Sequence, residues 1–256
     1  MTVTKNNRYM KAIIIGATSG IGREIALRLI GEGWETGLAG RRIEELEAIK
    51  RDFGKDSVHI AQIDVTKDDA AEKLDELIKE TGSPDLLLYV SGVGYHNREL
   101  DPEKEIRTVR TNCEGMVRIV DYFVNYVRSK PELYNKGHMA HVAVVTSVAG
   151  TKGMSSAPAY SASKKMGSTY ISALVQLSRM EKIPVKFTDI RPGFVATAIL
   201  DPNKHYPMMM SKEKAAEHIM KALKRRARVC TFDWRYRVLV FFWRLLPDCI
   251  WERMVL

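Results

Sequence analysis

Short apolar runs alternate with amphipathic stretches along most of the chain. The first run, "KAIIIG" at 11–16, is rich in β-branched residues and ends in glycine, which is typical of a buried strand. At 20–33 apolar residues recur with helical spacing before Gly33. The same alternation predicts strands at 34–40, 57–64, 84–92, 141–147 and 185–193, and helices at 42–54, 67–82, 103–130 and 158–181.

A strand followed by a helix, repeated in this way, predicts an α/β fold. Right-handed crossovers would give a doubly wound parallel sheet covered on both faces, a three-layer Rossmann arrangement. The 256 residues contain no linker, low-complexity segment or short repeat. We therefore expect a single domain, with a core at about 11–231 and a helical tail at 232–256.

The composition, 45% hydrophobic and 28% charged residues, is that of a soluble globular protein. The first twenty residues do not resemble a signal peptide, and no apolar run reaches the ~18 residues of a spanning helix. Cys113, Cys230 and Cys249 form no CxxC pair, which favours reduced thiols and a cytoplasmic protein. His138 and His141 lack further ligands nearby, so a surface role is favoured and no metal site is predicted.

The net charge of +9 is concentrated near the carboxyl end. From Lys221 onward there are nine basic and three acidic residues, and 232–256 reads "FDWRYRVLVFFWRLLPDCIWERMVL". Pro247 is expected to divide this aromatic, basic tail into two short helices. The tail could pack on its own subunit over the substrate pocket, lie at an oligomer interface, or contact a membrane surface peripherally. No nucleic-acid-binding motif is present, so no nucleic-acid partner is expected.

The segment "GATSGIG" follows the first predicted strand and supplies Gly16, Gly20 and Gly22. Glycine tolerates the positive φ of a sharp strand-to-helix turn and leaves the backbone amides open. A helix that begins near Gly20 directs its positive end at an anion. The segment therefore predicts a dinucleotide phosphate loop, the alternative being a plain tight turn.

The end of the second predicted strand indicates which dinucleotide is bound. An acidic residue there would hold a ribose 2′-hydroxyl, but this chain has Gly40 followed by Arg41 and Arg42. Guanidinium groups can grip a 2′-phosphate, and cations at a helix N-terminus call for a compensating anion. NADP(H) is therefore predicted over NAD(H), the alternative being two solvated arginines.

The segment "YSASK" at 160–164 places Tyr160 and Lys164 on one side of a helix. A nearby ammonium lowers the pKa of a phenol, which suits proton exchange with a carbonyl or an alcohol. Ser147 ends a predicted strand, and strand carboxyl ends face the ligand crevice in such sheets. These three residues are therefore predicted to be catalytic.

These motifs resemble the short-chain dehydrogenase/reductase family of the classical type, from about residue 11 to 225. "GATSGIG" is similar to its TGxxxGIG loop, "TS" with "YSASK" to its Ser and YxxxK, and "RPGFVAT" (191–197) to its PG motif. The resemblance implies that Ser147 orients the carbonyl, that Tyr160 donates the proton, and that Lys164 also binds the nicotinamide ribose. It implies that Asn112, in "RTNCEG", holds a water linking Lys164 to solvent and so joins the other three in the predicted catalytic set.

The resemblance also implies the cofactor contacts. Asp64 would contact adenine, and Val195 and Thr197 the carboxamide. The predicted cofactor-binding set is Gly16, Thr18, Ser19, Gly20, Ile21, Gly22, Arg41, Arg42, Asp64, Val65, Ser91, Gly92, Tyr160, Lys164, Pro192, Gly193, Val195 and Thr197.

We therefore predict an NADPH-dependent oxidoreductase that interconverts a ketone and a secondary alcohol. The tail aromatics and Met208 to Met210, assigned to a substrate lid, favour a lipophilic substrate such as a keto-lipid, steroid or ketoacyl compound. The family suggests a homodimer or homotetramer built on 103–130 and 158–181. The alternative is a catalytically silent NADP(H)-binding or scaffold protein of the same fold.

Two positions depart from the family pattern. Ile15 stands where a Thr is usual, and "YVSG" (89–92) replaces Asn-Asn-Ala-Gly. Losing both polar partners together leaves no orphaned hydrogen-bonding group. We therefore expect Ile15 to pack near Tyr89 without loss of cofactor binding.

Overall fold

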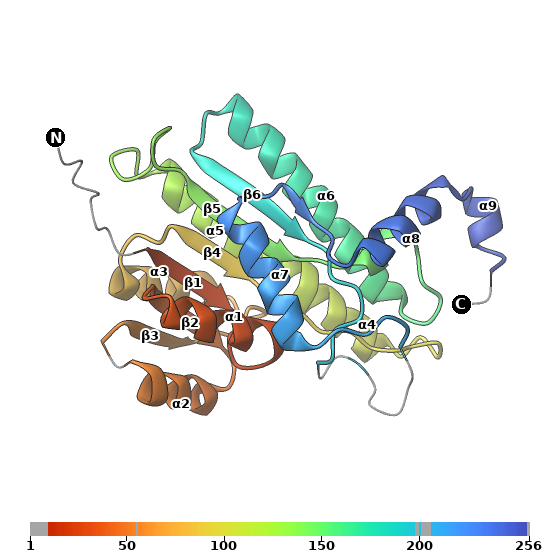
Figure 1. Cartoon of the computed structure of the whole chain (residues 1–256), viewed down its shortest axis with the longest axis horizontal. Helices are drawn as coiled ribbons and strands as arrows, with labels where there is room; N and C mark the ends of the chain where they lie inside the picture. Colours follow the sequence, from red (N-terminus) through yellow and green to blue (C-terminus); the bar gives the residue numbers. More distant parts are fainter. Residues whose placement is uncertain (1–9, 55, 198–199, 201–205, 255–256) are drawn as a thin grey trace.

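The computed structural model describes residues 10–54, 56–197, 200 and 206–254. Within these ranges seven parallel strands form one sheet in the order β3-β2-β1-β4-β5-β6-β7 (Figure 1). The strands are β1 (Lys11–Ile15), β2 (Glu35–Gly40), β3 (Val58–Gln62), β4 (Leu86–Tyr89), β5 (Ala140–Val145), β6 (Val185–Ile190) and β7 (Val229–Cys230). The predicted doubly wound fold is confirmed.

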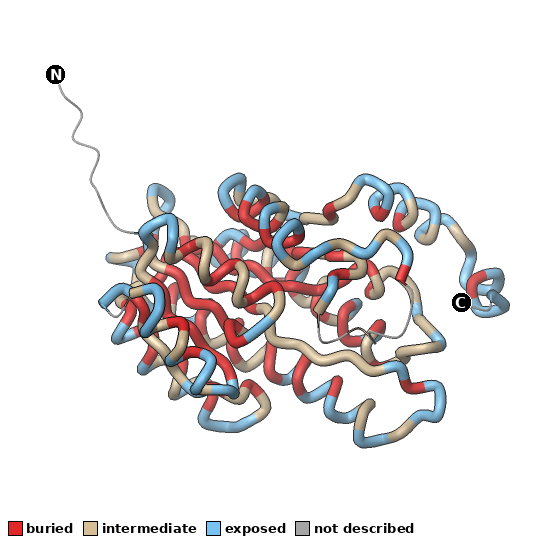
Figure 2. Tube along the Cα trace, turned by 60° about the horizontal axis from the view of Figure 1, so that its bottom comes forward, coloured by how far each residue is buried: buried red, intermediate tan, exposed pale blue. Residues whose placement is uncertain are grey.

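Helices cover both faces of the sheet, so its central strands are largely buried (Figure 2), while the edge strands β3 and β7 are only partly buried. One face packs against α1 (Gly20–Gly31), α2 (Ile43–Phe53) and α7 (Lys212–Lys224). The other packs against α3 (Ala70–Thr81), α5 (Gly115–Arg128) and α6 (Pro158–Met180). The sequence pattern did not single out α7 or the two-residue strand β7.

The strand order reverses between β1 and β4. Strands β1 to β3 run to one edge of the sheet, and β4 then pairs with the free side of β1. The loops that leave the carboxyl ends of β1 and β4 therefore diverge, and a crevice forms at this switch point. The fold thus brings together the residues that follow β1, β4, β5 and β6.

The helix predicted at 103–130 is interrupted by a π-helical turn. It consists of α4 (Pro102–Val109), the π-helical segment Arg110–Glu114, and α5. Such turns occur often at functional sites because they redirect a few side chains and free backbone carbonyls. Here the turn contains Asn112, one of the predicted catalytic residues.

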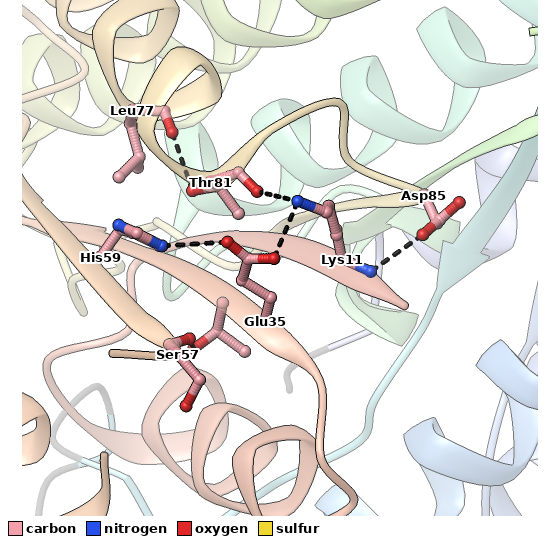
Figure 3. A network of polar contacts seen from close by, with 8 residues as sticks. Lys11, Glu35, Ser57, His59, Leu77, Thr81 and Asp85 are labelled. Atoms are coloured by element: carbon pink, nitrogen blue, oxygen red, sulfur yellow. Dashed lines mark hydrogen bonds and ion pairs between the residues drawn. The ribbon is translucent and has the colours of Figure 1, made fainter. Parts of the chain in front are cut away.

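The amino ends of the strands carry a polar network, drawn in Figure 3. The Lys11 ammonium donates to the Thr81 carbonyl at 2.7 Å and pairs with Glu35 at 2.8 Å, and Glu35 also contacts His59 at 3.2 Å. Burial opposes the shift, but Lys11 and His59 together hold the pKa of Glu35 below its ordinary value. This network ties β1, β2 and β3 together at their amino ends, on the opposite side of the sheet from the crevice.

The expected surface role of His141 is wrong. His141 lies in β5, where it is buried and its Nε2 is 2.8 Å from the Thr188 hydroxyl on β6. Burial lowers its pKa to about 4, so the ring is neutral at ordinary pH. His138 lies 3.0 Å from the Asp85 carboxylate. Among the described residues no three His, Cys, Asp or Glu side chains are grouped as metal ligands would be.

Pro247 separates two helices in the tail, α8 (Trp234–Leu245) and α9 (Asp248–Trp251), as predicted. The Lys152 ammonium donates to the Leu246 carbonyl at 2.9 Å and pairs with Asp248. The Trp251 indole donates to the Gly153 carbonyl at 2.7 Å. These contacts hold the tail against the loop that follows β5. In the part of the chain that is described, no helix has the length and apolarity needed to cross a bilayer.

Ile15 and Tyr89 are neighbours in adjacent strands and belong to the same buried core, so the expected apolar packing is confirmed. The sequence did not indicate what the phenol would do. Its hydroxyl donates to the Thr111 carbonyl, in the π-helical turn, at 3.0 Å. Tyr89 therefore ties β4 to the turn that carries Asn112.

We expect Tyr89→Phe to lower the free energy of unfolding by about 1–3 kcal/mol, because the buried Thr111 carbonyl loses its donor. Urea denaturation monitored by circular dichroism measures the loss. Tyr134→Phe is the matched control, since its buried hydroxyl donates to the Pro84 carbonyl at 2.9 Å away from the crevice. Both variants should lose similar stability, and unchanged stability of Tyr89→Phe would contradict this role.

Candidate active site

One cavity of about 1280 Å³ opens at the carboxyl ends of the strands. This volume exceeds the roughly 300–1,000 Å³ that one drug-sized ligand occupies, as expected where two ligands bind side by side. Its wall includes most of the predicted site residues: Gly16, Thr18, Ser19, Gly20, Ile21, Arg41, Arg42, Asp64, Val65, Ser91, Gly92, Ser147, Tyr160, Lys164, Pro192, Gly193, Val195 and Thr197.

The glycine loop forms a compact turn between β1 and α1. Gly16 and Gly20 have φ of +98° and +56°, a region that favours glycine. A Cβ on Gly16 would lie 2.7 Å from the Ser91 nitrogen, and one on Gly22 would lie 2.1 Å from the Gly16 carbonyl oxygen. Gly22 therefore lies behind the cavity wall, where it allows α1 to approach the turn.

The N-terminus of α1 is open to an anion. Ser19 occupies the N-cap position without a side-chain cap hydrogen bond, and the first turn contains no acidic residue. The Ser19 side chain therefore leaves the first backbone amides of α1 unoccupied, beside the positive end of the helix dipole. These features fit the pyrophosphate of a dinucleotide.

The arginine pair lies at the end of β2. Arg42 is the N-cap residue of α2, and its guanidinium donates to the Thr18 hydroxyl at 2.9 Å. A Cβ on Gly40 would lie 2.5 Å from the Thr18 methyl carbon. A larger residue at position 40, an acidic one included, would therefore require the Thr18 side chain to move.

Asp64 follows β3 and faces the same end of the cavity. Its carboxylate accepts from the Thr66 backbone and hydroxyl at 3.0 and 2.8 Å. Burial opposes the shift, but these bonds, with the charges of Arg41 and Lys67, hold the pKa of Asp64 below its ordinary value. Asp64 is thus an ionised acceptor near Arg41.

Three of the predicted catalytic residues, Ser147, Tyr160 and Lys164, converge from the end of β5 and from α6. Ser147 follows β5 and caps the short 3₁₀ helix Val148–Thr151, with its oxygen accepting from the Ala149 amide at 3.1 Å. Tyr160 and Lys164 lie one turn apart on α6, and the Lys164 nitrogen is 5.6 Å from the centre of the Tyr160 ring. The Ser147 hydroxyl lies close enough to Tyr160 to act on the pKa of its phenol.

Burial decides the protonation of this group. It raises the pKa of Tyr160, which the nearby Ser147 hydroxyl opposes, and lowers the pKa of Lys164 to about 8. The structure therefore contradicts the expectation that the Tyr160 pKa is lowered. The reason is that Lys164 lies over the ring and is itself desolvated, while its ammonium donates to the Val145 carbonyl at 3.0 Å.

Asn112 lies behind the cavity wall and makes direct contacts. Its amide accepts from the Val93 nitrogen and donates to the Val93 carbonyl, both at 2.8 Å, and donates to the Ser163 hydroxyl at 3.0 Å. A Cβ on Gly92 would lie 3.3 Å from both the Asn112 oxygen and the Lys164 nitrogen. Asn112 thus joins the loop after β4 to α6, beside Lys164; its role in holding a water stays a prediction.

The loop after β6 is held by a buried acid. The Asp189 carboxylate accepts from the Thr146 hydroxyl at 2.5 Å and from the Arg191 guanidinium at 2.6 and 2.7 Å. Asp189 is wholly buried. This bridge connects the residue before Ser147 to the start of the PG motif and fixes the two loops relative to each other.

Tyr236, from the tail, clamps the PG motif in a way the sequence analysis missed. Its ring occupies the space of a side chain on Gly193, where a Cβ would lie 2.1 Å from a ring carbon. Its hydroxyl accepts from the Phe194 amide at 3.2 Å and donates to the Pro207 carbonyl at 2.9 Å. Gly193 therefore makes room for the tail.

The three methionines assigned to a lid do not act together. Met208 lines the cavity, Met209 is exposed, and Met210 packs in the core opposite Val195. Residues 198–199 and 201–205, which precede them in the proposed lid, lie outside the described residues.

The cavity wall also includes apolar and aromatic side chains outside the predicted set, together with His96 and Arg98. Sequence reasoning did not assign most of them, because they come from loops and from the tail, where no motif marks a position. They include Val93, Tyr95, Met154, Phe194, Tyr206, Leu239 and Trp243.

Comparison with known proteins agrees with this geometry. The family model described as short chain dehydrogenase matches residues 10–207. An uncharacterized oxidoreductase of Myxococcus xanthus is 30% identical over 250 residues, which cover 95% of each chain.

Solved structures share the fold at lower identity. An alcohol dehydrogenase from Thermococcus sibiricus, complexed with 5-hydroxy-NADP, has a TM-score of 0.73 at 24% identity and covers 88% of this chain and 95% of its own. A 3-ketoacyl-(acyl-carrier-protein) reductase from Brucella melitensis, complexed with NADH, has a TM-score of 0.76 at 19% identity, with 87% and 94% covered. With the family model and the Myxococcus relative, the chain belongs to the short-chain dehydrogenase/reductase family of oxidoreductases.

Proposed function

We propose that this protein is an NADP(H)-dependent oxidoreductase that reduces a lipophilic ketone to a secondary alcohol, or catalyses the reverse reaction. The observation that carries the proposal is the convergence of Ser147, Tyr160 and Lys164 on one cavity whose wall also includes the glycine loop and several apolar side chains. A proton donor, an oxygen-holding hydroxyl and a cation are the groups that carbonyl reduction requires.

Each residue then has one task in the reduction. A bound NADPH supplies the hydride for the carbonyl carbon. Ser147 holds the carbonyl oxygen, and Tyr160 gives that oxygen its hydroxyl proton. The charge of Lys164 stabilises the phenolate that remains. In the reverse direction the phenolate removes the alcohol proton.

The lining supports the substrate class. Leu239 and Trp243 of α8, with Phe194 and Met208, place apolar surface next to the catalytic groups. A ketone with a long chain or fused rings removes this surface from water when it binds. We therefore place keto-lipids, steroid ketones and ketoacyl compounds ahead of small polar carbonyls.

We expect Tyr160→Phe to lower kcat/KM for ketone reduction by about 10²–10⁴-fold, because the proton donor is removed. NADPH oxidation is followed against a panel of long-chain ketones, steroid ketones, ketoacyl thioesters and sugars. NADPH binding, measured by cofactor fluorescence, should be unchanged.

Tyr170→Phe, on the same helix and bonded to Asp121, is the matched control and should keep wild-type turnover. Turnover of the sugars alone would overturn the lipophilic assignment. A Tyr160→Phe variant that retains the function of the wild type would instead favour the silent NADP(H)-binding protein.

We expect Arg41→Ala to weaken NADPH binding by about 10- to 100-fold and to leave NADH binding unchanged, because a charge-assisted bond to the 2′-phosphate is lost. Arg41 is exposed at the cavity and close enough to Asp64 to act on its pKa. Arg51→Ala, on the exposed side of α2, is the control. Equal losses for both dinucleotides would contradict the assignment.

We expect ketone reduction to decline as pH rises above about 8, where Lys164 loses its charge. Tyr160 stays protonated in this range because burial raises its pKa, so the decline reports the lysine.

Rate profiles against pH for wild type, Lys164→Met and the exposed neighbour variant Lys165→Met measure this effect. Lys164→Met should lose most of its activity and should no longer show the decline of ketone reduction with rising pH. Lys165→Met should keep both the activity and the decline of wild type. A reduction rate that stays level well above the Lys164 pKa would contradict the role of its charge.

A further inference from the structure

The helix α8 presents apolar side chains on two opposite faces. Tyr236 and Val240 are buried, and Leu239 and Trp243 line the cavity. The opposite face carries a stripe of five large apolar side chains that are 46–65% exposed. We call this the outer stripe: Trp234, Val238, Phe241, Phe242 and Leu245.

The inner face alone accounts for the docking of α8 on the body of the protein. A helix that covers a core needs one apolar face, and its opposite face is normally polar. The outer stripe repeats at positions i, i+4, i+7, i+8 and i+11, so its members lie along one line of the helix surface. Contiguous exposed apolar surface of this kind marks an interaction site.

Positive charge flanks the outer stripe. With about 100° of rotation per residue, Arg237 and Arg244 fall along one edge of the stripe and Arg235 along the other. All three are exposed, and the helix Trp234–Leu245 contains no acidic residue. Arg235 pairs with Asp233, the residue just before the helix. Arg237 and Arg244 have no acidic neighbour inside the helix.

The position of α8 makes the stripe accessible to a flat surface. Figure 1 shows α8 and α9 at one end of the molecule, away from β1 to β3. Ile250 and Met254, in and just after α9, are also exposed. The bonds from Lys152 and Trp251 hold this region against the body, so the stripe is displayed by a fixed element.

We propose that α8 docks the protein on an anionic membrane surface, with the outer stripe in the interfacial layer and the flanking arginines on lipid phosphates. Aromatic and aliphatic side chains bordered by arginine suit the boundary between headgroups and acyl chains. The cation excess near the carboxyl end complements an anionic leaflet. A second copy of the chain fits less well, because a two-fold contact would place these arginines against themselves.

The docking proposal extends the proposed function and rests on it in one respect, because it takes the substrate to be lipophilic. The same helix lines the cavity with Leu239 and Trp243. A membrane-bound α8 therefore places this part of the cavity wall beside the bilayer, where a lipophilic ketone is concentrated. The substrate then reaches Tyr160 with a short passage through water.

The experiment is co-sedimentation of the full-length protein with lipid vesicles, without substrate or cofactor. Vesicles of phosphatidylcholine alone are compared with vesicles that also contain phosphatidylserine, at low and high salt. We expect binding to the anionic vesicles, weakened by salt. Phe241→Ser should lower the partition coefficient by about tenfold. Arg237→Gln with Arg244→Gln should lower it by about tenfold or more on anionic vesicles.

Matched controls separate the stripe from general surface effects. Phe53→Ser removes another exposed phenylalanine, 49% exposed on α2 against 59% for Phe241, and Lys214→Gln with Arg225→Gln removes two exposed charges from the α7 region. Both controls should bind like wild type. Brominated phosphatidylcholine should quench the tryptophan emission of bound wild type, and Trp234→Phe should lose most of this quenching.

Three outcomes overturn the proposal. Wild type could fail to bind anionic vesicles at low salt, or the stripe variants could bind as well as the controls. Vesicle-free self-association that Phe241→Ser abolishes, without vesicle binding, would assign the stripe to a second copy of the chain. Vesicle binding by a protein that turns over no ketone would overturn the proposed function and leave the docking in place.

Discussion

The burial of one ammonium group constrains the whole site. Lys164 is 7% exposed, and a charge in such a place is costly unless hydrogen bonds and nearby charge offset the lost hydration. The Val145 carbonyl accepts from it, and the nearby charge of Asp189 favours its charged form. Position 92 lacks a side chain that would crowd the nitrogen. The resulting pKa of about 8 leaves Lys164 mostly charged at neutral pH. A ligand that binds above the lysine can therefore change its protonation.

The loops that meet at this lysine are tied to one another by buried bonds. Asp189 joins the ends of β5 and β6, Asn112 joins the loop after β4 to α6, and the Tyr89 hydroxyl holds the turn that carries Asn112. Each bond satisfies a polar group that the fold would otherwise bury alone. The geometry of the catalytic groups therefore depends on strand ends rather than on flexible loop tips, which favours preorganisation.

The sequence was informative where the chemistry is local. A glycine turn after a strand, the Tyr160–Lys164 spacing and the arginine pair predicted the phosphate-loop end of the cavity, because each depends on a few neighbouring residues. The strand and helix periods predicted the sheet for the same reason. Tertiary effects were not predictable in this way. The π-helical turn, the use of Gly193 to admit Tyr236, and the apolar wall from α8 arise when segments far apart in the chain meet. The sign of the Tyr160 pKa shift was missed because burial, which no spacing reveals, outweighs the nearby lysine.

Tyr236 links the tail to the PG motif at the cavity wall. Tyr236 leaves the inner face of α8, covers Gly193, and bonds both the Phe194 amide and the Pro207 carbonyl. Tyr236 therefore couples the position of α8 to the PG motif and to Pro207. One helix therefore carries the exposed stripe, the cavity wall and the clamp, so the proposed docking surface and the PG motif share a single rigid element.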